Sequence, residues 1–67
     1  MNLQINDFGH YRVTNHGGRQ YVLFNRQSDV IIDISQAAYR SIMQSEDPLH
    51  QCAYVYMVHM DSLEVGA

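Results

Sequence analysis

Two runs rich in β-branched and aromatic residues, separated by a short glycine-containing segment, limit the folds open to this chain. The runs are HYRVT (residues 10–14) and QYVLFN (residues 20–25), and NHGGR lies between them. This pattern is typical of two strands joined by a short loop. Asn15, Gly17 and Gly18 are residue types that tolerate the positive φ of tight turns. We therefore predict a β-hairpin.

The segments on either side extend the hairpin into a small sheet. RQSD (26–29) is a turn signal, and VIIDI (30–34) is predicted to form the next strand. Short loops between consecutive strands favour an antiparallel meander. NLQI (2–5) is either an additional edge strand or a loose start of the chain.

The hydrophobic period changes after this strand. Apolar residues recur at every fourth position and polar residues occupy the opposite side: Ile34, Ala38 and Ile42 against Gln36, Arg40 and Gln44. This periodicity predicts an amphipathic helix of about three turns. Asp33 or Ser35 can cap its start, and Asp47-Pro48 is expected to end it.

The last apolar run, QCAYVYMVHMDSL (51–63), allows two interpretations. Its tyrosines and valines favour a strand over residues 52–60, whereas a helix is the alternative, because periodicity alone does not settle a short apolar run. With the strand, the expected fold is a single small α+β domain over residues 1–67. Its element order is β-β-β-α-β, and the one amphipathic helix packs on one face of an antiparallel sheet.

A chain of 67 residues buries a small core and usually needs an additional source of stability. Cys52 is the only cysteine, which excludes an internal disulfide and fits a reducing compartment. The remaining sources of additional stability are a metal, a partner chain or an efficient core. The predicted strands favour a partner, because both faces of several strands are apolar and one helix covers only one face of a sheet. Either Leu3, Ile5 and Phe8 fold over the second face, or that face is a homodimer or partner interface.

Three kinds of chemical site are disfavoured. A phosphate-binding glycine loop normally precedes a helix, whereas TNHGGRQ (14–20) lies between two predicted strands. A zinc site needs a second ligand pair beside His50 and Cys52. Cys52 also lacks the electropositive setting of a reactive thiol. We therefore predict no enzyme activity, no catalytic residues, no metal and no cofactor.

The predicted site is a protein-binding surface. Its candidate residues are aromatic, cationic or polar groups on the last segment and on the hairpin: Tyr54, Tyr56, Arg12, Arg19, Tyr21 and His16. Tyrosine and arginine are common anchors in binding hot spots. The alternative is a single-stranded nucleic-acid or nucleotide-binding module, because Tyr11, Arg12, Arg19 and Tyr21 alternate on one hairpin.

Charge argues against general nucleic-acid binding. The net charge is −3, there is no lysine, and residues 41–67 carry a net charge of −4. The start, MNLQIND, lacks a signal-peptide pattern, and no apolar run reaches the ~20 residues of a membrane helix. We expect a cytoplasmic homodimer that inhibits or regulates another protein. A phage or mobile-element accessory protein with an anti-defence role would fit so small a chain.

Overall fold

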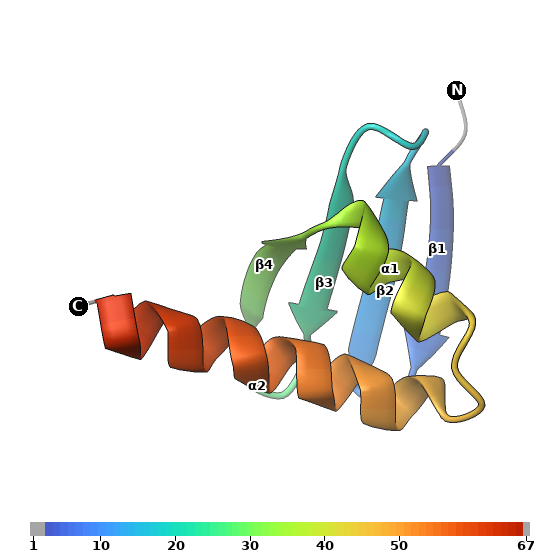
Figure 1. Cartoon of the computed structure of the whole chain (residues 1–67). Helices are drawn as coiled ribbons and strands as arrows, with labels where there is room; N and C mark the ends of the chain where they lie inside the picture. The colour runs from blue at the N-terminus through green and yellow to red at the C-terminus, as the bar shows by residue number, and fades with distance from the viewer. Residues whose placement is uncertain (1–2, 67) are drawn as a thin grey trace.

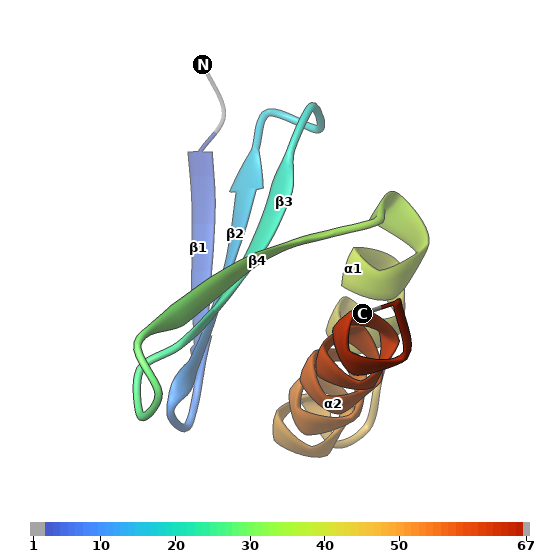
Figure 2. The same ribbon diagram turned by 90° about the vertical axis from the view of Figure 1, so that its left-hand side faces the viewer.

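The computed structural model describes residues 3–66 and has the predicted α+β architecture (Figure 1). In chain order the elements are β1 (Leu3–Phe8), β2 (Tyr11–His16), β3 (Tyr21–Asn25), β4 (Val30–Ile34), α1 (Gln36–Met43) and α2 (Pro48–Gly66). The four strands form one antiparallel sheet in the order β1-β2-β3-β4. Both helices lie on the same side of this sheet (Figure 2). Over residues 3–66 the fold is therefore a two-layer structure in which one sheet face carries no helix.

The segment predicted as a loose start or an edge strand is the first strand of the sheet. β1 pairs along its whole length with β2, from Leu3 opposite His16 to Phe8 opposite Tyr11. The two strands are joined by a tight turn in which Gly9 has φ 60°. Because Leu3 and Ile5 belong to β1, the N-terminal segment does not fold over the second face, and that interpretation is wrong.

TNHGGRQ forms a turn, as the hairpin pattern predicts. Gly17 and Gly18 adopt φ values of 61° and 76° between β2 and β3. The Gly18 N–H donates to Asn15 Oδ1 at 2.8 Å, and the Arg19 N–H donates to the His16 carbonyl at 3.1 Å. The N–H groups of Gly18 and Arg19 are thus occupied within the loop, and the strand β3 follows it instead of the helix that follows a phosphate-binding loop.

Asn25, the one polar residue among the buried set, organises the turn between β3 and β4. Its Oδ1 accepts hydrogen bonds from the N–H groups of Gln27 at 2.9 Å and Ser28 at 3.3 Å, while its carbonyl accepts from Asp29 at 2.8 Å. Asp29 closes the turn with φ 60°, a conformation that Asp tolerates better than most residues. The RQSD turn signal is confirmed.

The first helix is shorter than its sequence pattern predicts. Ser35 is the N-cap, and its hydroxyl accepts from the Ala38 N–H at 3.0 Å. The helix ends at Met43 with Gln44 as C-cap, before Asp47-Pro48. These two residues instead begin α2, since Asp47 Oδ1 accepts from the His50 N–H at 3.2 Å. Proline suits the first position of a helix because its missing N–H has no partner there in any case.

The strand predicted over residues 52–60 is wrong, and the helical alternative is right. The whole run lies within α2, the 19-residue helix Pro48–Gly66. The Asp47-Pro48 start favours a helix, and tertiary packing outweighs the strand propensity of tyrosine and valine. The element order is therefore β-β-β-β-α-α, and two helices rather than one cover the sheet.

The core lies between the helix layer and the inner sheet face. Its buried apolar residues are Tyr11, Val13, Leu23, Ile32, Ile42 and Cys52. The strand members of this set alternate along β2, β3 and β4, so their immediate neighbours point to the opposite face. Gln51 Nε2 donates to Ser41 Oγ at 3.2 Å and links the two helices.

Candidate protein interaction surface

The sheet face without helices is the candidate site, and we refer to it as the open face. Its central side chains form two rows across the sheet. The first row contains Ile5, Thr14, Val22 and Asp33, and the second contains Asp7, Arg12, Phe24 and Ile31. Leu3 and His16 pair beside the first row. The open face therefore combines apolar and polar side chains in equal number: Leu3, Ile5, Val22, Phe24 and Ile31 against Asp7, Arg12, Thr14, His16 and Asp33.

The apolar groups of the open face are exposed to an unusual degree. Relative exposure reaches 66% at Ile31, 57% at Leu3 and 52% at Ile5, whereas Val22 and Phe24 are half-buried. An antiparallel sheet with one free face normally presents polar residues to water. A contiguous apolar patch on a small protein usually marks a binding surface.

Polar groups lie at two corners of the open face. Arg12 Nε donates to Asp7 Oδ1 at 2.8 Å, and its Nη2 donates to Oδ2 at 3.3 Å. This hydrogen bonding lowers the pKa of Asp7 and raises the pKa of Arg12. At the opposite corner, Gln20 Nε2 donates to Asp33 Oδ1 at 3.1 Å. Apolar groups combined with hydrogen-bonded polar groups are common in protein interfaces.

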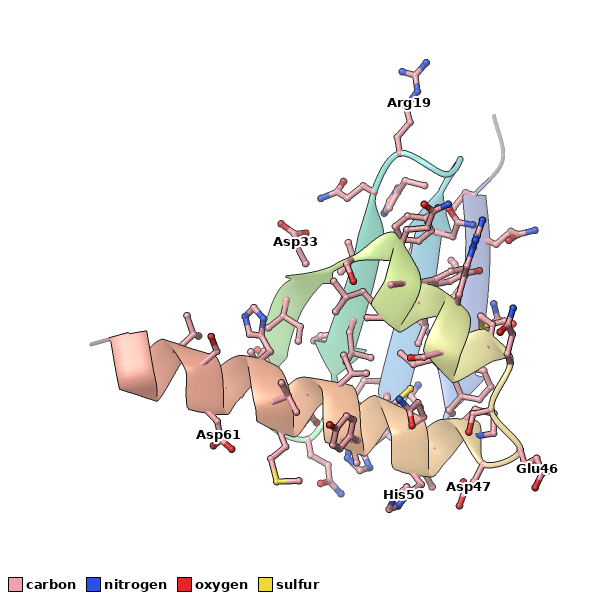
Figure 3. All side chains as sticks on the ribbon, in the orientation of Figure 1. Arg19, Asp33, Glu46, Asp47, His50 and Asp61 are labelled. Carbon is pink, nitrogen blue, oxygen red and sulfur yellow. The ribbon has the colours of Figure 1, made fainter. Side chains whose placement is uncertain are left out.

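The structure does not bring the six predicted partner-binding residues together. Arg12 and His16 lie on the open face, and Arg19 projects from the tip of the β2–β3 loop (Figure 3). Tyr54 is 54% exposed, but it lies on α2, on the other side of the molecule.

Tyr21 and Tyr56 have structural contacts. Tyr21 packs on Tyr39 of α1 with ring centroids 4.7 Å apart, and its hydroxyl donates to the Gly18 carbonyl at 3.4 Å. Tyr56 packs on Tyr11 at 5.8 Å, and its hydroxyl shares a 2.9 Å hydrogen bond with Ser28. Both rings therefore connect the helix layer to the sheet or its turns.

Sequence reasoning found the apolar faces but did not select the residues that dominate the open one. The sequence predicts Phe24 and Ile31 as strand residues, and Leu3 and Ile5 either as part of an edge strand or as part of a segment folded over the second face. The signal is present in the sequence, because VLF and VII lack the alternation of a half-exposed strand. Which of the two faces stays open depends on where the helices pack, and this is visible only in the structure.

The nucleic-acid alternative loses the surface it requires. Tyr11 is 5% exposed and Tyr21 is half-buried, and both point toward the helices. Arg12 points to the opposite face and is paired with Asp7. The hairpin therefore does not present aromatic rings and cations on one surface, as stacking of single-stranded bases requires.

The arrangement of side chains is also unfavourable for a metal site and for a nucleophilic cysteine. Within residues 3–66, no group of three His, Cys, Asp or Glu side chains is placed to hold a metal ion. His50 is exposed while Cys52 is buried, because two residues on a helix separated by two positions point in different directions. Burial raises the pKa of the Cys52 thiol to about 11, so the nucleophilic thiolate is disfavoured near neutral pH.

Two further findings bear on the molecule as a whole. Over the described part of the chain, no helix has both the length and the apolar character needed to cross a membrane.

Comparison with protein-family models, with curated proteins and with solved structures gave no match.

Proposed function

We propose that this chain is a non-enzymatic protein that binds another protein through the open face. One observation carries the proposal: a four-stranded sheet leaves one face free of helices and exposes Leu3, Ile5 and Ile31 on it. The partner would present an apolar ridge or sheet face, with polar groups that match the Asp7–Arg12 pair at one corner. Within this class, inhibition or regulation of the partner is the proposed role.

Arg19 is the proposed peripheral contact. It extends from the β2–β3 loop beyond the end of the sheet (Figure 3). A partner that covers the open face and passes this end of the sheet would contact it. An anti-defence role in a phage or mobile element remains a prediction that depends on the small size of the chain alone.

The test is partner capture with a matched pair of variants. Ile5→Lys places a charge on the open face, whereas Met57→Lys makes the same change at a similarly exposed site on α2 (52% and 56% exposed). A half-exposed isoleucine contributes on the order of 1–2 kcal/mol when fully buried. Ile5→Lys should therefore weaken capture at least ~10-fold, and Met57→Lys should leave it unchanged.

Circular dichroism of both variants provides the folding control. Arg19→Ala should weaken capture by a smaller factor, because contacts at the rim of an interface contribute less than contacts at its centre. Equal capture by wild type and Ile5→Lys, with the fold intact, would exclude the open face as the binding surface.

A further inference from the structure

The second helix is longer than the sheet on which it packs. Its 19 residues span about 28 Å at 1.5 Å per residue. Four strands at about 4.8 Å spacing make a sheet only about 19 Å wide. α2 begins near β1 and runs across the strands, so its C-terminal end lies beyond β4 (Figure 1). This overhanging end of α2 faces none of the four strands β1–β4.

The apolar stripe of α2 continues along the overhang. Cys52, Tyr56 and Leu63 are spaced by four and seven residues and therefore share one side of the helix. Cys52 is fully buried and Tyr56 half-buried on the sheet, whereas Leu63 is 57% exposed. The stripe thus extends past the point at which the sheet stops.

The sheet stops at an edge that lacks the usual protection. β4 is the terminal strand and has the sequence VIIDI. Natural edge strands are commonly blocked by Lys, Pro or a bulge, because an unprotected edge pairs with other strands. Asp33 is the only charged residue in β4. An additional strand can therefore add to the sheet at β4.

A groove of about 500 Å³ lies between α1 and α2, next to the end of β4. Ala37, Ala38 and Ser41 form one wall, and Tyr54 and Val58 contribute to the other. Small residues on the first wall allow a helix to approach closely. Tyr54 and Val58 are about half exposed there, at 54% and 49%.

We propose that a second copy of this chain occupies the β4 edge and the groove, forming a two-fold symmetric dimer. β4 pairs with β4 of the second copy, which makes one eight-stranded sheet. The overhang of each α2 then lies over the β4 of the other copy, where Leu63 meets the inner sheet face, and reaches toward the groove. A second copy supplies both the strand that the edge lacks and the sheet that the overhang lacks, as an isologous interface requires.

The strand sequence is compatible with this pairing. Antiparallel pairing centred on Ile32 places Asp33 opposite Ile31 of the second copy. The two aspartates are therefore not directly opposite each other, where like charges would be destabilising.

The area is sufficient for a stable dimer. The β4 side of the molecule is about 17 Å long and roughly 20 Å deep through the sheet and helix layers. Each copy also provides an overhang and receives one, adding roughly 150 Å² for each. The estimated contact area, treated as a flat surface without the additional area of protruding side chains, approaches 650 Å² per copy. This is close to the ~800 Å² of a standard interface.

The first test measures the dimer dissociation constant by analytical ultracentrifugation. The double variant Val58→Arg/Leu63→Arg places charges in the groove and on the overhang, both at sites already half exposed in a single chain. We expect its dissociation constant to rise at least about tenfold. Met57→Arg is the matched control, because Met57 is 56% exposed on the same helix and does not line the groove.

The second test measures the arrangement of the strands. Spin labels at Ile5→Cys report the separation of the two β1 strands, while the buried Cys52 stays unlabelled. At opposite ends of an eight-stranded sheet the β1 strands lie about 34 Å apart. Packing of two open faces, or pairing of two β1 edges, would bring them within about 20 Å.

Three results would overturn the proposal. The first is a monomer at about 100 μM, a concentration far above the dissociation constant of a standard interface. The second is a dimer that Met57→Arg weakens as much as the double variant does, and the third is a distance within about 20 Å between the spin labels on the two β1 strands. The proposed dimer leaves the open face free. Results that exclude the dimer therefore do not exclude binding of another protein through the open face. Ile5→Lys tests only the open face and should not change the dissociation constant.

Discussion

At the scale of single residues, Gly9 determines how closely α2 approaches the first hairpin. It has φ +60°, and a Cβ atom built there would lie 2.8 Å from Leu49 Cδ1. We predict that Gly9→Ala lowers the free energy of unfolding by about 2 kcal/mol, since the left-handed backbone alone costs roughly 1–2 kcal/mol. Urea denaturation measures the loss.

Gly18→Ala is the control for this prediction. Gly18 has a similar φ, +76°, but the nearest atom to a new Cβ is the Tyr21 hydroxyl at 3.8 Å. Gly18→Ala should therefore show the backbone cost without the steric conflict. Equal losses at the two positions would mean that Leu49 moves aside freely, and the close contact would then contribute nothing.

Cys52 makes stability depend on alkaline pH. Burial raises the pKa of its thiol from 9.0 to about 11. Above pH 9 the unfolded chain loses this proton while the folded chain retains it, so the free energy of unfolding falls as pH rises from 9 to about 11. The shift corresponds to a loss on the order of 2 kcal/mol. Burial also raises the pKa of Tyr11, which acts in the same direction at higher pH.

Denaturation at a series of pH values checks the contribution of Cys52. Cys52→Ala lowers stability at every pH because it leaves a cavity, but its pH profile should be flatter between pH 9 and 11. Parallel profiles for wild type and variant would contradict the assignment to the thiol.

At the scale of elements, Asp47 stabilises the start of the last helix. Its carboxylate caps α2 by accepting from the His50 N–H. We predict that Asp47→Ala lowers the free energy of unfolding by about 1 kcal/mol, the usual cost of losing an N-cap. Glu46→Ala, at the preceding exposed position, should change it by less than about 0.5 kcal/mol. Thermal unfolding followed by circular dichroism measures both, and equal effects would contradict the capping role.

The same residues show where sequence reasoning succeeds and where it fails. The turns at Gly17-Gly18 and at 26–29 follow from local backbone preferences, so the hairpins can be predicted. Asp47-Pro48 is ambiguous, since proline both stops one helix and starts another. The run after it is apolar on all sides because α2 packs on the sheet and also exposes Tyr54, Met57 and Val58, and this removes the periodicity that identifies a helix.

The candidate site illustrates the same limit. Two apolar sheet faces can be inferred from the strands, but Tyr21 and Tyr56 were assigned to the surface although both support the core. Their position depends on contacts with Tyr39 and Tyr11, which are distant in the sequence. Side-chain type predicts what a residue can bind, whereas long-range packing decides whether it is accessible.

At the scale of the whole molecule, a small core limits the stability of the single chain. Six apolar residues are buried among residues 3–63, for which burial is described, and a 67-residue domain typically has a free energy of unfolding of roughly 3–10 kcal/mol. Truncation of one buried side chain, as in Ile42→Ala, lowers the free energy of unfolding by about 2–5 kcal/mol, which is a large part of the total. Burial of the α2 overhang and the β4 edge in a dimer would add stability that the single chain lacks.

The proposed dimer predicts a melting temperature that rises with protein concentration. Binding that involves only the folded state stabilises it by mass action, so a hundredfold increase in concentration should raise Tm by roughly 5–10 °C. In Val58→Arg/Leu63→Arg, Tm should be lower, and it should be independent of concentration wherever the concentration lies below the raised dissociation constant, because only the single chain unfolds there. Differential scanning calorimetry over that range separates the cases. A concentration-independent Tm for the wild type would show that the core of one chain suffices, and the overhang of α2 would then need another explanation.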